Sequence, residues 1–169
     1  MATRPKGGAV VAREPRVRYE VSPRQAAPRA LLDVSVLIAL LDADHLHHAR
    51  AAAWLSENIA AGWASCPITQ NGCVRIMSEP GYPNALPAAR VAERLREAVA
   101  TEHHAFVPED LSLLDATRFD TEQLLGHRQV TDAYLLGLAV AHGLRLVTFD
   151  ASIAMRVVRG AAAGLVVSL

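Results

Sequence analysis

ALLDVSVLIALL, residues 30–41, is the stretch that decides the fold, because an apolar strand in it passes directly into an apolar helical segment. The first part, Ala30–Asp33, has the continuous apolar character of a buried strand and ends on a carboxylate. The second part, Val34–Leu41, is expected to be helical. A carboxylate bracketed by core residues is costly unless it is paired or binds a metal ion. Asp33 is therefore the first candidate for a functional residue.

Two further acids have the same setting near the end of the chain. Asp150 follows the apolar run 146–149, and Asp132 lies at the start of the apolar stretch 130–136. Each of the three aspartates also has a purely structural explanation, since Asp near a helix start caps free N–H groups and complements the helix dipole. Their joint occurrence, far apart in the sequence, favours one site that collects all three carboxylates.

The rest of the chain alternates strand and helix signals. We expect helices at 45–60, 67–78, 86–101, 131–142 (capped by Thr131) and 152–156, a helical turn at 112–114, and strands at 63–66, 105–107, 145–148 and 165–167. This alternation predicts an α/β fold with a central, mainly parallel sheet. In such sheets ligands bind beyond the carboxyl ends of the strands, where Asp33, Asp132 and Asp150 can converge.

Length and charge indicate one folded domain preceded by a basic arm. The chain has 169 residues and zero net charge, but residues 1–30 carry +5 and the remainder −5. Residues 1–29 contain four prolines and no apolar periodicity, so they are expected to be disordered, with the folded domain at 30–169. The acidic body argues against phosphate-backbone binding over its whole surface, whereas acids gathered at one point suit a divalent cation.

Cysteines and histidines indicate neither a disulfide framework nor a zinc site. Cys66 and Cys73 have no zinc-type spacing and are expected to be reduced. The histidines at 45, 47 and 48 are expected to be surface or packing groups. No signal peptide is visible, and no apolar run approaches the ~20 residues that span a bilayer. We therefore expect a soluble, cytoplasmic protein with no membrane partner.

An oxygen-only site of three aspartates selects Mg²⁺ or Mn²⁺. Such an ion polarises a phosphoryl oxygen, activates a bound water and neutralises the leaving oxygen. Metal-assisted hydrolysis of a phosphodiester is the reaction that this acidic site predicts.

Four segments together resemble PIN-domain ribonucleases, and most closely the VapC-type toxins of bacterial toxin–antitoxin pairs. They are residues 31–41, 67–75, 126–135 and 146–150, in the order in which the family has them. The resemblance covers 30–169 and implies a three-layer α/β/α sandwich and a Mg²⁺- or Mn²⁺-dependent endoribonuclease. It also implies a homodimer and a cognate antitoxin encoded alongside. Single-stranded or looped RNA, such as tRNA or rRNA, is the expected substrate.

The resemblance also assigns roles to residues. By motif position, Asp33, Asp132 and Asp150 match the catalytic metal-site acids, with Asp33 and Asp132 holding the main ion and Asp150 binding it directly or through water. The supporting pocket is expected to contain Ser35, Gln70, Asn71 and Thr148. Contacts with RNA or antitoxin are assigned to Arg75, His127 and Arg128, each of which also fits an ordinary exposed residue.

One departure from the family keeps a second function open. Gln70 stands in a segment where many relatives carry Glu, and an amide adds no charge and cannot act as a base. The alternative is a catalytically weak or inactive PIN-like module that binds RNA or a protein. A phosphatase or receiver-like domain with Asp33 as nucleophile is disfavoured, because position 35 is Ser rather than a second Asp and the body contains no lysine.

Overall fold

A five-stranded parallel sheet forms the centre of the molecule. The computed structural model describes residues 27–153 and 155–169. The strands are β1 (Ala30–Leu32), β2 (Trp63–Ser65), β3 (His104–Phe106), β4 (Arg145–Thr148) and β5 (Val166–Ser168). Their order is β3-β2-β1-β4-β5, and every neighbouring pair is parallel. The expected parallel α/β architecture is confirmed.

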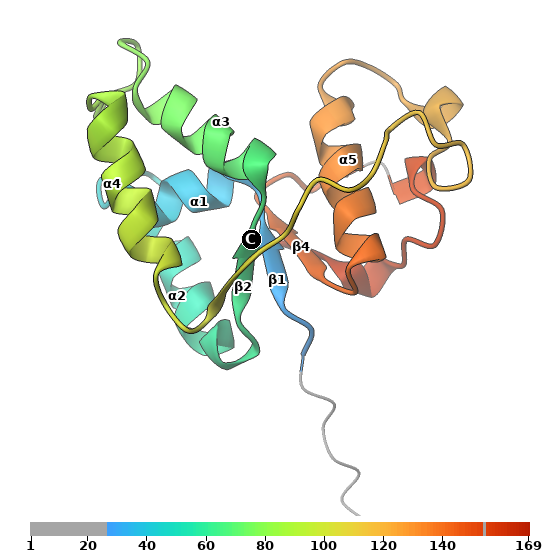
Figure 1. Cartoon of the computed structure of the whole chain (residues 1–169), viewed down its shortest axis with the longest axis horizontal. Helices are drawn as coiled ribbons and strands as arrows, with labels where there is room; N and C mark the ends of the chain where they lie inside the picture. Colours follow the sequence, from blue (N-terminus) through green and yellow to red (C-terminus); the bar gives the residue numbers. More distant parts are fainter. Residues whose placement is uncertain (1–26, 154) are drawn as a thin grey trace, which may run out of the picture.

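Helices cover both faces of this sheet. They are α1 (Val34–Leu41), α2 (His48–Asn58), α3 (Pro67–Met77), α4 (Ala88–Val99) and α5 (Gln129–Ala141), with short 3₁₀ turns at Ile59–Ala61, Thr121–Gln123, Met155–Val157 and Ala163–Leu165. Figure 1 shows α1 to α4 gathered on one side and α5 with the C-terminal segments on the other. The result is the expected three-layer α/β/α sandwich.

Alternation along the strands gives each face its own core. Successive side chains of a strand point to opposite faces of the sheet. Leu32 and Val147 accordingly pack with α1 to α4, whereas Leu31 and Leu146 pack with α5. Because both faces are covered, the central strand β1 is apolar and buried at each of its positions, which is the pattern that residues 30–32 show in the sequence.

The α5 face depends on one glycine. A methyl group at Gly137 would lie 2.3 Å from Cζ of Phe119, so only glycine lets that ring pack against the helix. Phe119 is buried and its ring lies parallel to that of Tyr134 at 6.4 Å. The Tyr134 hydroxyl in turn donates to the carbonyl of Leu111, which fastens the long segment before α5 to the helix.

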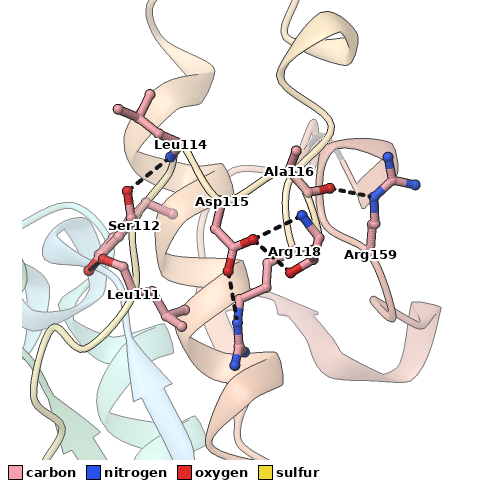
Figure 2. A network of polar contacts seen from close by, with 9 residues as sticks. Leu111, Ser112, Leu114, Asp115, Ala116, Arg118 and Arg159 are labelled. Carbon is pink, nitrogen blue, oxygen red and sulfur yellow. Dashed lines mark hydrogen bonds and ion pairs between the residues drawn. The ribbon is translucent and has the colours of Figure 1, made fainter.

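This segment is held by polar contacts rather than by regular structure. The Asp115 carboxylate accepts hydrogen bonds from the backbone and hydroxyl of Thr117 and pairs with Arg118 (Figure 2). Arg159 donates to the carbonyl of Ala116, so the segment is joined to the chain beyond β4. The helical turn expected at 112–114 is a single hydrogen-bonded turn, in which Asp115 N donates to the carbonyl of Ser112 at 3.0 Å and Leu114 N donates to the Ser112 hydroxyl.

Several expected boundaries were wrong. The helix expected at 45–60 begins at His48, and the one expected at 131–142 begins at Gln129 with Arg128 at the cap position. Thr131 is therefore not a cap. The helix expected at 152–156 is the 3₁₀ turn Met155–Val157, and residue 154 lies outside the described residues. Most of the arm predicted at 1–29 also lies outside them.

No helix within the described ranges is long and apolar enough to cross a membrane.

Candidate metal site and groove

The strand order brings β1 and β4 together at the middle of the sheet. The chain runs outward from β1 through β2 to β3, and β4 and β5 then lie on the other side of β1. This reversal is the kind of switch point at which α/β sheets bind ligands, beyond the carboxyl ends of the strands. Asp33 directly follows β1, and Asp150 lies two residues beyond the end of β4.

Asp33 is fixed by three hydrogen bonds. It is the N-cap of α1, and its Oδ1 accepts from Val34 N at 2.6 Å. Its Oδ2 accepts from the hydroxyls of Ser35 at 2.7 Å and Thr148 at 3.0 Å. Asp33 can therefore be both a helix cap and a site residue, because the capping bond orients its carboxylate at the carboxyl end of β1.

Thr148 connects the two strand-end acids. Its side chain is fully buried, donates to Asp33 and accepts from the backbone N–H of Asp150 at 3.0 Å. The Asp150 carboxylate is exposed, and its Oδ1 accepts from the hydroxyl of Ser152 at 2.6 Å and its N–H at 2.7 Å. These bonds lower the pKa of Asp150. Asp150 is therefore held in its charged form.

Asp132 approaches the same point from α5. It lies in the first turn of that helix and is partly buried. Burial raises its pKa to about 6, and the negative charges of Asp33 and Asp150 contribute to the shift. The charges of Asp33 and Asp150 therefore act on Asp132, whereas the role of the three aspartates in holding a metal ion stays a prediction.

This donor set fits a divalent cation. A bound cation would offset the mutual repulsion that disfavours the charged form of Asp132. Hard ions such as Mg²⁺ use few protein carboxylates and retain several waters. Among the described residues, no three Asp, Glu, His or Cys side chains form a group that could hold a metal ion directly. An ion at the three aspartates would therefore need waters to complete its coordination.

A groove of about 400 Å³ runs from Asp33 along α3. Asn71 and Arg75 line it one helical turn apart, and Thr131 closes its α5 side. The lining residues are Asp33, Val34, Ile68, Asn71, Gly72, Arg75, Ile76 and Thr131. The structure thus brings Asn71 and Arg75 together with Asp33. Thr131 and Gly72 also line the groove, although the sequence motifs do not assign them to the pocket.

Gly72 sets the width of this groove. A methyl group at position 72 would lie 2.8 Å from Cγ2 of Val34. Glycine therefore allows α3 to approach the start of α1, so that Asn71 and Arg75 line the same groove as Asp33.

Gln70 does not line the groove beside Asp33. Its amide nitrogen donates to the hydroxyl of Ser65 at 2.9 Å, and that hydroxyl also bonds Nε2 of His104. The residue lines a second hollow between α3 and α4, together with Arg96 and with Asn71, which borders both hollows. Helical phase explains the difference, because positions 68, 72 and 76 face Asp33 and position 70 points toward α4. The structure does not bring Gln70 into the acidic groove.

His127 and Arg128 lie at the start of α5. Both are exposed, and neither lines the groove. Arg128 occupies the cap position of α5 without a side-chain capping bond. Their predicted contact with RNA or antitoxin stays a prediction.

Comparison with known proteins identifies the family to which this chain belongs. The family model "PIN domain" matches residues 30–158. The ribonuclease VapC44 of Mycobacterium tuberculosis is 53% identical over 133 residues, which cover 79% of this chain and 94% of that protein. The chain therefore belongs to the PIN-domain family. Within that family it groups with the VapC-type ribonucleases.

Solved structures support the fold. VapC20 of Mycobacterium tuberculosis, described as a toxin that cleaves the sarcin–ricin loop, aligns with a TM-score of 0.52 at 16% identity and covers 73% of this chain and 92% of its own. A chain of VapBC2 from Rickettsia felis, solved with a promoter DNA fragment, aligns with a TM-score of 0.50 at 13% identity, over 76% of this chain and 92% of its own.

Proposed function

We propose that this chain hydrolyses RNA with a Mg²⁺ or Mn²⁺ ion held by Asp33, Asp132 and Asp150. Family membership makes the chain an endoribonuclease of the VapC toxin type. The metal dependence and the residue roles are the proposal. The observation that supports them is that Thr148 links Asp33 and Asp150 at the sheet's switch point, while the partly buried Asp132 has its pKa raised to about 6 by burial and by the charges of these two acids.

Each residue has a defined task in this proposal. Asp33 and Asp132 hold the main ion, and Asp150 binds it directly or through water. Ser35 and Thr148 keep the Asp33 carboxylate turned toward the ion by donating to its Oδ2. When bound, the ion supplies an activated water and neutralises charge on the phosphodiester.

The groove beside these acids suits the RNA backbone. Arg75 carries the positive charge needed to contact a phosphate, and Asn71 offers an amide to a sugar or base. An accessible backbone is required for scission, so single-stranded or looped regions of tRNA or rRNA are the proposed substrate.

A cognate antitoxin and a homodimer complete the proposal. VapBC2 from Rickettsia felis supports the antitoxin, and we expect it to be encoded beside this chain. An antitoxin that inserts Arg or Lys among the three aspartates would inhibit by replacing the metal charge. Co-purification with the product of the adjacent gene, and light scattering of the isolated chain, test these two partners.

The direct test compares the wild-type protein with Asp33→Asn on total tRNA, with Mg²⁺, Mn²⁺ or EDTA. We expect discrete fragments from the wild type with either metal and none with EDTA. The variant should cut more than about 100-fold more slowly, above the range for losing an outer-shell partner of a metal ligand. Glu57→Gln, which removes an exposed charge on α2, is the matched control and should cut normally.

An inactive module is the second candidate, because Gln70 adds no charge and bonds Ser65 instead of facing the acids. Calorimetry separates the two. Cleavage by the wild type, or Mn²⁺ binding that Asp33→Asn abolishes, supports the metal site. Absence of both cleavage and metal binding would establish the module and overturn the nuclease proposal.

A further inference from the structure

A second hollow adjoins the groove that starts at Asp33. It lies between α3 and α4, which pack against each other (Figure 1), and its volume is about 280 Å³. The side chain of Asn71 lines both the hollow and the groove, so the two meet at this residue. Pockets for small ligands begin at about 300 Å³, and the hollow is therefore of a size that suits a single nucleotide.

The charge of this α3–α4 hollow is positive. Of the described residues that line it, Arg96 carries a charge and none is acidic. Arg96 is exposed in the last turn of α4, where a cation also complements the helix dipole. The acid one turn before it, Glu93, pairs with Arg90 instead. In a body with an excess of acids, an acid-free hollow with a guanidinium suits a phosphate next to the metal-binding aspartates.

Buried contacts fix the carboxamide of Gln70 at the wall of the hollow. Its Nε2 donates to the hydroxyl of Ser65 at 2.9 Å, and that hydroxyl lies 2.9 Å from Nε2 of His104. Ser65 is fully buried, and burial lowers the pKa of His104, so a neutral ring can accept from the Ser65 hydroxyl at pH 7. Because the amide nitrogen of Gln70 is used in this way, its carbonyl oxygen is the group left to accept from a ligand.

The rest of the lining suits the apolar faces of a base. Val74, Leu95 and Val99 line the hollow beside the two polar side chains. A nucleotide needs an apolar contact for its base, a cation for its phosphate and hydrogen-bonding groups for the edge of the base. The hollow supplies all three, and it supplies them next to the groove in which the scissile phosphodiester is proposed to lie.

We propose that the α3–α4 hollow binds the RNA nucleotide next to the scissile phosphodiester, with Arg96 at its phosphate and the Gln70 carbonyl oxygen at an amino group of its base. This inference rests on the proposed nuclease function, because that function places the scissile phosphodiester in the adjoining groove. It gives Gln70, which does not face the acids, a role in selection: adenine, cytosine and guanine carry an exocyclic amino group, and uracil does not.

The first experiment tests the phosphate contact of Arg96. Fluorescein-labelled cytidine dodecamers are titrated with full-length Asp33→Asn protein in Mg²⁺ and about 50–200 mM KCl, and binding is followed by anisotropy. Adding Arg96→Gln should raise the Kd and reduce the slope of log Kd against log salt by about 0.7, the value for one phosphate of a single strand. Arg94→Gln is the matched control, because Arg94 is exposed on α4 and lines neither the hollow nor the groove. It should leave the slope unchanged.

The second experiment tests the base contact of Gln70. Cytidine and uridine dodecamers are compared, because cytosine has an amino group where uracil has a carbonyl oxygen. We expect cytidine to bind about fivefold more tightly, as for one hydrogen bond, and Gln70→Met to remove this preference. Gln123→Met, at an exposed glutamine outside the hollow, should retain it. Thermal melting checks that Gln70→Met is folded, and the Arg96 experiment does not depend on that variant.

Three outcomes would overturn parts of this inference. An unchanged Kd and slope in Arg96→Gln would overturn the nucleotide subsite. Equal binding of cytidine and uridine dodecamers would overturn the role of Gln70. If Arg96→Gln left RNA binding unchanged but weakened co-purification with the product of the adjacent gene, the hollow would bind a protein instead of RNA.

Failure of the subsite and failure of the nuclease proposal give different results. If the wild type cuts total tRNA and Arg96→Gln cuts it with unchanged KM, the subsite is wrong and the nuclease proposal stands. If the wild type cuts nothing but RNA affinity depends on Arg96, RNA binding in the hollow stands and the nuclease proposal is wrong.

Discussion

The two halves of the acidic site differ in how the protein treats its carboxylates. On the strand side, Asp33 and Asp150 accept five hydrogen bonds from Val34, Ser35, Thr148 and Ser152. On the helix side, the Asp132 carboxylate receives no hydrogen bond from the described residues, and its pKa is raised to about 6. The strand side is therefore preorganised by hydrogen bonds, whereas the Asp132 carboxylate is the group whose charge the proposed cation would stabilise.

The largest expected effect comes from a substitution that displaces α5, the helix that carries Asp132. Gly137→Ala places a methyl group 2.3 Å from the ring of Phe119, so α5, which carries Asp132, must shift. Alanine would otherwise favour a helix, yet we expect a net loss of about 1–3 kcal/mol from overpacking. Urea unfolding measures this loss, and RNA cleavage should fall with it.

Gly81→Ala is the control, because nothing lies within 4 Å of the added methyl group. Partial recovery in Gly137→Ala/Phe119→Leu would confirm the clash as the cause. Equal stability of Gly137→Ala and the wild type would contradict the close packing on this face.

A smaller effect is expected on the strand side, from Thr148→Val. The change keeps the shape but removes the hydroxyl that joins Asp33 to Asp150 N. Losing these buried bonds should cost about 1–2 kcal/mol, because a partner is left unsatisfied. Cleavage should fall about 10- to 100-fold, as when an outer-shell partner of a metal ligand is lost.

The exposed threonine at 101 offers a matched control. Thr101→Val should leave cleavage unchanged. If Thr148→Val cut RNA as fast as the wild type, the strand side would not depend on its hydrogen bonds, and the contrast between the two halves would disappear.

The smallest expected effect is a gain in stability, from Asp132→Asn. The pKa of Asp132 is about 6 in the folded protein against an ordinary 3.8, so between these values the folded state holds more protons than the unfolded state. Stability therefore falls as pH rises from about 4 through 6. Asp132→Asn removes this penalty, and should stabilise the metal-free protein at pH 7 by about 1 kcal/mol, after allowance for solvent screening.

Urea unfolding in EDTA at pH 7 and pH 4 measures this gain, which should be absent at pH 4. The same variant should lose cleavage, so stability and activity would move in opposite directions. Destabilisation of the metal-free protein by Asp132→Asn would show that Asp132 is instead a stabilising helix residue.

The strand-end acids could be predicted from the sequence because parallel strands bring their carboxyl ends to one edge. Asp33 and Asp150 each follow an apolar run, and that is enough to place them together. The groove was only partly predictable. Asn71 and Arg75 share a helix face with Ile68 and Ile76, whereas Gln70 was assigned by motif position and its helical phase points it toward α4.

Other features depend on contacts that sequence patterns do not encode. Thr131 was expected to cap α5, but nothing in residues 129–130 prevents the helix from starting earlier, and Gln129 Oε1 accepts from Leu125 N just before it. The ring of Phe149 packs 4.6 Å from that of His47 although the two residues are far apart in the sequence, so the histidines alone give no indication of this contact.

The most direct test of the metal site is a calorimetric titration with Mn²⁺ of the wild type, Asp33→Asn and Asp132→Asn. We expect the wild type to bind Mn²⁺ and both variants to lose at least about tenfold in affinity, since each removes a charged ligand from a different half of the site. Unchanged Mn²⁺ affinity in Asp132→Asn would contradict the claim that the two halves are completed by one cation.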